Sequence, residues 1–412
     1  MGNPAWRFEG NERKYIEEVL STGFRAGADG AFTTRFEQYW AAMHGAPFAV
    51  AFNSGTSTLH AAVLALGCGP GDEVLVPALT PLMCGLAPHY TGAIPVYVDS
   101  DPDTFLMDPA DLERKITERS RAIMVVHMYG GVCDMSAILA VAKRHGLPVI
   151  EDCAQCVLGR DPKGRITGAS GAVGSWSFEN SKQLTSGDGG IVVCHDEALA
   201  ARIRKIGGLG FKTLTAAAGR VRVDRSMFQD PNWERFELIG YNYRLNQLAA
   251  AVALAQAERA QYFVGLRRAM GEGYRAVLRR SKLLRPQAQP PGYIYTYYTF
   301  SAKFCGAEHG VSWYDLRAKH MEFGGDGIFA AAKLLYQEPA FRDRKIGRGT
   351  TPVAEDLQRR LMNFTTNQPT AQDRNIQLEA LSKALRFFGD KDSAWEEVES
   401  PGSDSISPAR VL

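Results

Sequence analysis

The chain has 412 residues, of which 45% are hydrophobic and 22% charged, the balance of a globular protein long enough for two domains. Its 47 basic and 45 acidic residues nearly cancel, so no bulk charge favours binding to nucleic acid or to an anionic membrane. The N-terminus lacks an apolar signal segment and no apolar run reaches membrane-spanning length, so we expect a soluble cytoplasmic protein.

Between residues 47 and 206, short apolar runs alternate with amphipathic helical stretches. The apolar runs predict strands at 48–52, 73–77, 95–99, 121–130, 147–152, 173–178 and 190–194. The intervening stretches predict helices at 56–66, from Asp108-Pro109 onward, at 135–144 and up to Lys205. This alternation favours an α/β fold with a mainly parallel sheet, in which ligands bind at the carboxyl ends of the strands.

The pattern changes after the last of these helices. Residues 211–239 are irregular and rich in Arg, Asp and aromatic residues, which is typical of a long functional loop. A long Ala-rich helix is predicted over 246–270, continuing to about residue 280. The Pro-rich segment 285–292 then breaks the pattern, and 293–304 is predicted to be a strand.

These changes divide the chain into a large and a small part. We predict a large α/β domain over 1–255, with the first 30 or so residues packing on the small domain. A smaller C-terminal α+β domain is expected over 256–390. The last residues, 391–412, are rich in Ser, Pro and acids and are expected to form a mobile tail.

The seven cysteines predict free thiols. Their number is odd and the chain is long and lacks an export signal, which argues against a disulfide framework. Cys153 and Cys156 form a C-x-x-C pair of the kind used in redox or zinc sites. No second pair follows, however, and structural zinc takes four ligands. We therefore expect small buried side chains here and no metal site.

Two motifs close strands of the predicted sheet. The run Asn53 to Ser57 ends one strand and opens a helix, where amides and hydroxyls can bind phosphate, although Ser and Thr are also common helix caps. Asp152 ends another strand, next to Glu151. A buried carboxylate there needs a partner such as a protonated pyridine nitrogen, or else it caps the following turn.

A third motif contains Lys182, between a strand end and the Gly-rich turn at 187–190. Most loop lysines are simply solvated, but the glycines let the backbone pass close to a ligand. A lysine held near a cationic ring has a lowered pKa, which suits covalent chemistry with a carbonyl group. The fourth motif, Gly240-Tyr241-Asn242-Tyr243-Arg244, precedes the long helix and is by itself a polar turn.

In this order, the four motifs resemble those of the DegT/DnrJ/EryC1/StrS aminotransferase family, which are pyridoxal-5′-phosphate (PLP) enzymes that aminate keto-sugars and cyclitols. The runs at 67–74 and 98–104 are also similar to the family, and the resemblance covers roughly residues 8–260. It implies a fold type I PLP-dependent transferase with a seven-stranded, mainly parallel sheet. It also implies a homodimer in which each active site is shared between two subunits.

The resemblance assigns roles to individual residues. It implies that Lys182 carries the cofactor and that Asp152 pairs with the pyridinium nitrogen. Further cofactor contacts are implied for polar side chains, namely Thr56, Ser57, Gln155, Ser177 and Asn242. Asn242 is matched to an asparagine that reaches the cofactor phosphate of the partner subunit.

The chain also departs from the family pattern. The family usually has an aromatic residue after the Thr of a P-x-x-T motif, stacked on the cofactor ring, whereas Pro81 follows Thr80 here. A loop of the smaller domain is also not recognisable around 323–328. Either another residue covers the ring or the ring is covered less completely, and the usual members of the family do not indicate the substrate of this chain.

Other enzyme classes fit less well. The glycines at 67, 69 and 71 precede a strand, whereas the dinucleotide fingerprint follows one. No P-loop motif occurs. Family members that dehydrate sugars carry His in place of the lysine, so Lys182 favours amino transfer. A PLP-fold protein that binds or regulates without catalysis remains the alternative from another class.

The resemblance implies transfer of an amino group from glutamate or glutamine to a keto-sugar, nucleotide-linked, in amino-sugar or antibiotic biosynthesis. A cyclitol ketone is the alternative acceptor. Three arginines of the predicted loop, Arg220, Arg222 and Arg225, suit contacts to a phosphate group on the acceptor. Loop arginines are commonly just solvated, so both interpretations stay open.

Overall fold

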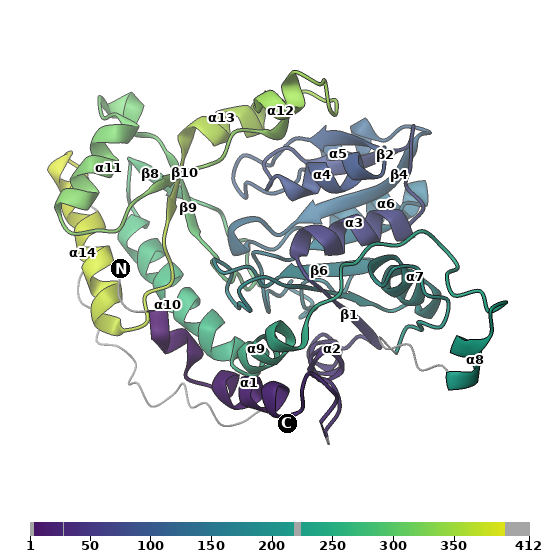
Figure 1. The fold of residues 1–412 in the computed structure, drawn as a ribbon. Helices are drawn as coiled ribbons and strands as arrows, with labels where there is room; N and C mark the ends of the chain where they lie inside the picture. The colour runs from purple at the N-terminus through teal and green to yellow at the C-terminus, as the bar shows by residue number, and fades with distance from the viewer. Residues whose placement is uncertain (1–3, 28, 218–223, 392–412) are drawn as a thin grey trace.

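The computed structural model of the chain describes residues 4–27, 29–217 and 224–391 (Figure 1). A seven-stranded sheet in the order β1-β7-β6-β5-β4-β2-β3 forms the centre of the larger part. The strands are β1 (Phe48–Phe52), β2 (Glu73–Pro77), β3 (Ile94–Val98), β4 (Ser120–Val126), β5 (Val149–Asp152), β6 (Val173–Ser177) and β7 (Gly190–Cys194). Among these strands only β7 pairs antiparallel with its neighbours, which confirms the expected α/β fold with a mainly parallel sheet.

Helices cover both faces of this sheet, as a parallel sheet requires. Successive residues of β1 show this directly, because Ala49 packs in one apolar cluster and Val50 in another. The helices are α1 (Glu12–Ser21), α2 (Phe32–Met43), α3 (Gly55–Ala65), α4 (Met83–Tyr90), α5 (Pro109–Lys115), α6 (Met135–His145), α7 (Glu197–Gly207) and α9 (Gln247–Glu258). Polar side chains accept the free amides of several first turns, as predicted for Asp108 at α5.

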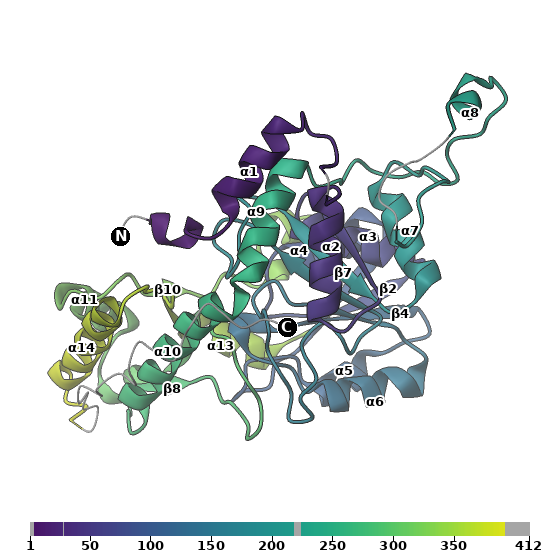
Figure 2. The ribbon, with the colours of Figure 1, turned by 90° about the horizontal axis from the view of Figure 1, so that it is seen from below.

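A second, four-stranded sheet lies beside the first (Figures 1 and 2). Its order is β10-β11-β9-β8, and all its pairs are antiparallel. The strands are β8 (Leu284–Pro286), β9 (Phe300–Phe304), β10 (Phe329–Ala330) and β11 (Leu361–Phe364). Helices α10 (Ala260–Leu278), α11 (Trp313–Glu322) and α14 (Ala371–Phe387) complete this part, and their apolar residues share one cluster with the strands.

Two predicted elements were wrong in extent. The long helix is broken at Arg259, whose φ of −106° and ψ of 12° separate α9 from α10. The strand predicted over 293–304 is reduced to β9, because Tyr297 has a φ of 44° and the residues before it bond elsewhere. Thr296 N–H donates to the carbonyl of Gly130, so this segment joins the two sheets instead of extending one.

The division at residues 255 and 256 stays a prediction, since the two parts are closely interlocked. Helix α1 packs on α9, and the Trp6 ring lies 5.9 Å from that of Phe263 in α10. Apolar residues of α12 (Pro339–Arg342) and α13 (Pro352–Arg360), such as Phe341, join the core cluster of the large sheet. The predicted mobile tail lies, from residue 392 on, outside the described residues. In the described part of the chain, no helix combines the length and apolarity needed to cross a bilayer.

Glu73, at the start of β2, links the large sheet to the C-terminal part of the chain through an ion pair. Arg348, 275 residues away in sequence, donates from Nη2 to Glu73 Oε2 at 2.6 Å, and Arg119 also pairs with the carboxylate. Burial raises the pKa of Glu73, but hydrogen bonds from Arg348, Thr117 and Arg119 outweigh it and lower the pKa to about 2.

We expect Glu73→Gln to lower stability at neutral pH and to flatten its acid dependence. The folded pKa lies below that of the unfolded chain, so the carboxylate stabilises the fold above pH 5 and loses this effect toward pH 2. Because the arginine partners are solvent-accessible, the loss is about 1 kcal/mol. Urea unfolding from pH 7 downward measures it. Glu113→Gln, in an exposed pair with Arg144, is the control, and identical acid profiles of wild type and Glu73→Gln would contradict the assignment.

Candidate active site

A cavity of about 290 Å³ lies at the carboxyl ends of β4, β5 and β6, beside the N-terminus of α3. This is the edge of the sheet where α/β proteins bind ligands. Five of the predicted site residues line it: Thr56, Asp152, Gln155, Ser177 and Lys182. The structure therefore brings together predicted side chains from the ends of two strands, β5 and β6, and from one helix.

The first turn of α3 forms one wall of the cavity. Ser54 caps the helix by accepting the amide of Ser57 at 3.1 Å. The amides of Gly55 and Thr56 have no acceptor among the described residues, and they line the cavity. A Cβ on Gly55 would lie 2.7 Å from the Cβ of Ser177, so only glycine lets this helix end approach β6. Free amides beside two hydroxyl groups make a site suited to phosphate.

Two of the predicted cofactor residues lie outside this cavity. Ser57 is buried, and its hydroxyl donates to Asn53 Oδ1 at 2.8 Å, within the turn itself. Asn242 is exposed, and its Oδ1 accepts from Arg244 Nε at 3.0 Å. In a single chain, Asn242 therefore contributes nothing to the wall of the cavity.

Asp152 presents a buried carboxylate at the end of β5, with only 2% of the residue exposed. Its Oδ1 accepts the amide of Ala154 at 2.9 Å, and its Oδ2 accepts the thiol of Cys84 at 3.2 Å. No cationic side chain of the described residues forms an ion pair with it. Burial raises the pKa of Asp152, and the smaller opposing effects of Ala154, Cys84 and the charge of Lys182 do not cancel this. Such a carboxylate is costly unless a cation is added beside it.

Lys182 faces the cavity from a short loop that is held at its backbone. Arg7, from the N-terminal segment, donates from Nη2 to the carbonyl of Lys182 at 2.7 Å and from Nη1 to that of Asn180 at 2.9 Å. The Nζ atom lies 4.9 Å from the ring centre of Tyr298 and pairs with no carboxylate among the described residues. The amino group of Lys182 is therefore held at the cavity, and no ion pair occupies it.

Gln155 connects the cavity to the segment after β4. Its Oε1 accepts the amide of Tyr129 at 2.7 Å, and the residue is only 7% exposed. Tyr129 has a φ of 62°, a left-handed backbone that non-glycine residues adopt only when their surroundings hold them there. The following glycine, Gly130, packs so closely on Tyr297 that a Cβ would lie 2.4 Å from its amide nitrogen. The wall of the cavity is thus closely packed at this point.

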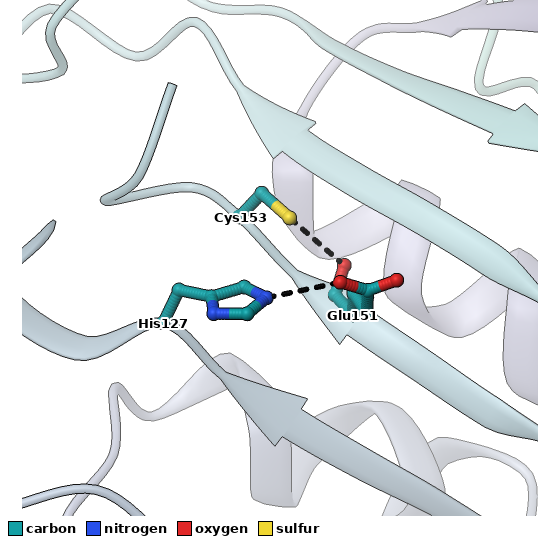
Figure 3. Close-up of side chains that lie close together, drawn as sticks. All are labelled: His127, Glu151 and Cys153. Atoms are coloured by element: carbon teal, nitrogen blue, oxygen red, sulfur yellow. Dashed lines mark hydrogen bonds and ion pairs between the residues drawn. The ribbon is translucent and has the colours of Figure 1, made fainter. Parts of the chain in front are cut away.

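His127, Glu151 and Cys153 lie close together behind the cavity (Figure 3). Their ligand atoms are near enough for a metal ion, but hydrogen bonds already use them. The His127 ring accepts the Cys133 amide at Nδ1, so Nε2 carries the proton and donates to Glu151 at 3.1 Å. Three further amides of the 168–171 turn donate to Glu151. The cluster therefore anchors the end of β5, next to Asp152, and its hydrogen bonds already use the Glu151 carboxylate and both nitrogens of His127.

Pro81 and Met83 line the cavity where the family pattern leads us to expect an aromatic ring. Pro81 replaces that aromatic residue in the sequence, and Met83 begins α4. Both side chains are apolar, and a flexible thioether packs well on an aromatic face. Ala154 and Val126 supply further apolar lining. The flat ring of a cofactor can therefore be covered here without an aromatic partner.

The chemistry of these groups fits PLP. The first turn of α3 and Ser177 are suited to bind its phosphate. A protonated pyridine nitrogen would supply the positive charge that the Asp152 carboxylate lacks, and the amine of Lys182 can form an imine with the aldehyde. A family model for the DegT/DnrJ/EryC1/StrS aminotransferases matches residues 7–377. The chain belongs to this family. It is a PLP-dependent aminotransferase, as the sequence motifs indicated.

Named relatives and solved structures agree with this assignment. The chain is 36% identical to the GDP-perosamine synthase of Escherichia coli O157:H7, over 93% of this chain and 97% of the relative. It is 35% identical to an L-glutamine:2-deoxy-scyllo-inosose aminotransferase of Micromonospora echinospora, over 85% and 86%. DesV of S. venezuelae, solved with a ketimine intermediate, superposes with a TM-score of 0.79 at 29% identity, over 92% of this chain and 94% of DesV. These similarities confirm the fold type I class.

Sequence reasoning missed several residues of the site. Ser54 and Gly55 line the cavity together with Thr56; they belong to the predicted phosphate-binding run Asn53 to Ser57, but only Thr56 and Ser57 were assigned as cofactor contacts. Cys84 had no such signal, because its contact with Asp152 depends on how α4 packs against β5.

The arginine hypothesis for the 211–239 segment remains a proposal. Arg220 and Arg222 lie outside the described residues, and Arg225 only marks the start of α8 (Arg225–Gln229). In Figure 2, α8 projects away from the rest of the chain, and no described residue of this segment lines the cavity.

Proposed function

We propose that this aminotransferase moves an amino group from glutamine or glutamate to a keto-sugar carried on a nucleotide, in amino-sugar or antibiotic biosynthesis. The observation that carries the chemistry is the free Lys182 in one cavity with the buried, unpaired Asp152. The full-length similarity to GDP-perosamine synthase supports the acceptor class. A cyclitol ketone is the second candidate, because the scyllo-inosose aminotransferase is nearly as similar.

A second, larger cavity supports an acceptor rich in hydroxyl groups. Its volume is about 470 Å³, and it adjoins the first through Ser181 and Tyr298, since Lys182 faces the Tyr298 ring. Side-chain amides and hydroxyls line much of it, including Asn363 and Asn367. Such groups hydrogen-bond ring hydroxyls and fix the orientation of a polar ligand.

Each residue has a proposed task in the reaction. PLP supplies an electron sink and carries the amino group between the two substrates when bound. The first turn of α3 and Ser177 would hold its phosphate, and Asp152 would keep the proton at its ring nitrogen. Lys182 would hold the cofactor through its amino group, and as a free amine its Nζ would be the base that takes the proton from the α-carbon of the donor. Gln155 lines the same cavity and would contact the edge of the ring.

The acceptor is tested by half-reactions. Loading the enzyme with glutamine or glutamate and then adding ketones one at a time separates donor from acceptor specificity. We expect turnover with nucleotide-linked 4-keto or 3-keto sugars and little with free cyclitol ketones. The reverse order of rates would favour the second candidate. If the donor half-reaction is normal but no ketone of either class accepts the amino group, both proposed acceptor classes are wrong.

We further propose a homodimer whose active sites are shared, working in the cytoplasm. Two aromatic residues with large exposed fractions, Tyr90 at 54% and Tyr241 at 37%, both pack on His60 near Asn242, and Ile239 is 94% exposed. An exposed apolar face of this kind suits a partner subunit. All seven cysteines are free thiols, which is compatible with a reducing compartment.

Mixing two inactive variants tests the shared site. If Asn242 reaches the neighbouring cofactor, a dimer of a Lys182→Ala chain with an Asn242→Ala chain contains one site with both defects and one with neither. We expect recovered activity from about a quarter of all sites in a statistical mixture. Differently tagged chains prove the mixing by co-purification. Proven mixed dimers without recovered activity would place Asn242 in its own subunit's site or in none.

A further inference from the structure

Arg267, on α10, is a buried cation that no carboxylate neutralises. The residue is 7% exposed, and its Nη1 donates to the carbonyl of Tyr298 at 2.8 Å and to Thr366 Oγ1 at 3.0 Å. Neither of these acceptors carries a charge. Throughout the described residues, no acidic group pairs with this guanidinium. Burial and the nearby charge of Arg7 lower the pKa of Arg267 to about 10, so the group is still charged at neutral pH.

A buried charge without a counterion is expensive, and proteins retain one where a ligand supplies the opposite charge. Arg267 lines the 470 Å³ cavity, and its remaining donors, Nε and Nη2, bond to no described residue. The planar guanidinium is suited to a carboxylate, which accepts two parallel hydrogen bonds from it.

The position of Arg267 relative to Lys182 indicates which class of ligand Arg267 binds. Both side chains lie against one ring, since the guanidinium carbon of Arg267 lies 5.7 Å and the Nζ of Lys182 4.9 Å from the ring centre of Tyr298. Ser181 hydrogen-bonds the hydroxyl of that ring at 3.0 Å and lies in the wall of the same cavity. A ligand held by Arg267 therefore reaches toward the amine on which the reaction depends. An amino acid, with an amine next to its carboxylate, has this arrangement of groups.

We propose that Arg267 binds the α-carboxylate of the amino donor and so makes the enzyme select an α-amino acid over a simple amine. The proposal rests on the transamination function proposed above. In the second half-reaction the keto acceptor occupies the site in place of the donor, and Arg267 then has no donor carboxylate to bind. The inference concerns donor binding and leaves the choice of ketone untouched.

Matched ligands isolate the carboxylate. L-Glutamine carries both groups, 4-aminobutanamide has the amine and lacks the carboxylate, and 4-carbamoylbutanoate has the carboxylate and lacks the amine. With the PLP-loaded enzyme, we expect Arg267→Met to lower kcat/KM of the donor half-reaction with L-glutamine at least about 30-fold. The slow reaction with 4-aminobutanamide stays unchanged. Calorimetry on the PLP-loaded Arg267→Met enzyme should show a similar loss of affinity for 4-carbamoylbutanoate.

Arg275 provides the matched control on the same helix. It also holds the loop before β9, through Tyr297 Oη and the carbonyl of Gln287, but it does not line the 470 Å³ cavity. Arg275→Met therefore reports the effect of loosening this loop alone, and we expect it to leave the ratio of rates with L-glutamine and 4-aminobutanamide unchanged.

Three results would overturn the proposal. The first is an Arg267→Met enzyme with the wild-type preference for L-glutamine over 4-aminobutanamide. The second is an equal loss with both amines, which indicates a structural role. The third is a loss confined to the acceptor half-reaction, which assigns Arg267 to an anionic group of the acceptor. If the wild type itself reacts with no amino acid, the proposed function has failed before this inference is reached.

Discussion

Replacing Lys182 by Ala is expected to lower the rate of the donor half-reaction by roughly 10⁴-fold or more, because this change removes both the covalent attachment and the proton-transferring amine. The fold should survive, since the main anchors of this loop are the backbone carbonyls that accept from Arg7. PLP should still bind through the first turn of α3. Single-turnover measurements on the loaded protein give the rate, and the melting temperature reports the fold.

Two controls separate chemistry from structure in this experiment. Lys163→Ala changes an exposed lysine of a neighbouring loop and should leave the rate unchanged. Adding small primary amines to Lys182→Ala should restore part of the rate, more so for stronger bases, because the free amine takes over the proton transfer. Borohydride reduction of the wild type should fix the cofactor on the peptide that contains Lys182. Fixation on another lysine, or normal turnover of the variant, would refute the assignment.

Asp152→Asn is expected to reduce kcat of both half-reactions by about 10²–10³-fold, the effect of removing one preorganised electrostatic contact from a transition state. The amide preserves the size of the side chain but no longer holds a proton on the ring nitrogen. Because the carboxylate is buried and its pKa is raised by burial, the neutral amide should not destabilise the protein without PLP. Melting temperatures of the two PLP-free proteins test this directly.

Cys84→Ala is the control for Asp152. It removes the thiol that donates to Oδ2 and leaves the negative charge in place. Burial keeps the pKa of Cys84 well above its ordinary value, so this thiol is a neutral donor. We expect a loss far smaller than that of Asp152→Asn. Near-normal turnover of Asp152→Asn would show that the carboxylate caps the turn at Ala154 and has no electrostatic role.

Much of the fold follows from local patterns in the sequence. Strands such as 48–52 and 73–77 are largely buried, so they consist mostly of apolar residues, and these short apolar runs predict their positions. The segment 293–304 has the same apolar and aromatic character, yet most of it bonds to loops of the other sheet. That outcome depends on tertiary contacts with Gly130 and Arg160, which local patterns do not contain.

The site shows the same limit. Lys182, Asp152 and Ser177 were identified because each follows a strand end, where a parallel sheet gathers its ligands. Ser57 was predicted to contact the cofactor because it carries a hydroxyl group in the motif, but the sequence does not show where that hydroxyl points. In the structure it donates to Asn53 within the turn. Cys84 and Arg267 come from helices that sequence alone does not orient, so their positions beside Asp152 and Tyr298 required the structure.

The visible absorbance of the PLP-loaded protein tests the central claim most directly. Cofactor attached to Lys182 should give a visible band, which L-glutamine or L-glutamate should bleach at a stoichiometry of one per chain. A competent keto-sugar should then restore the band. A protein that binds PLP and keeps its band unchanged with every amino donor would contradict the account, and would favour a PLP-fold protein that binds the cofactor without catalysing transfer.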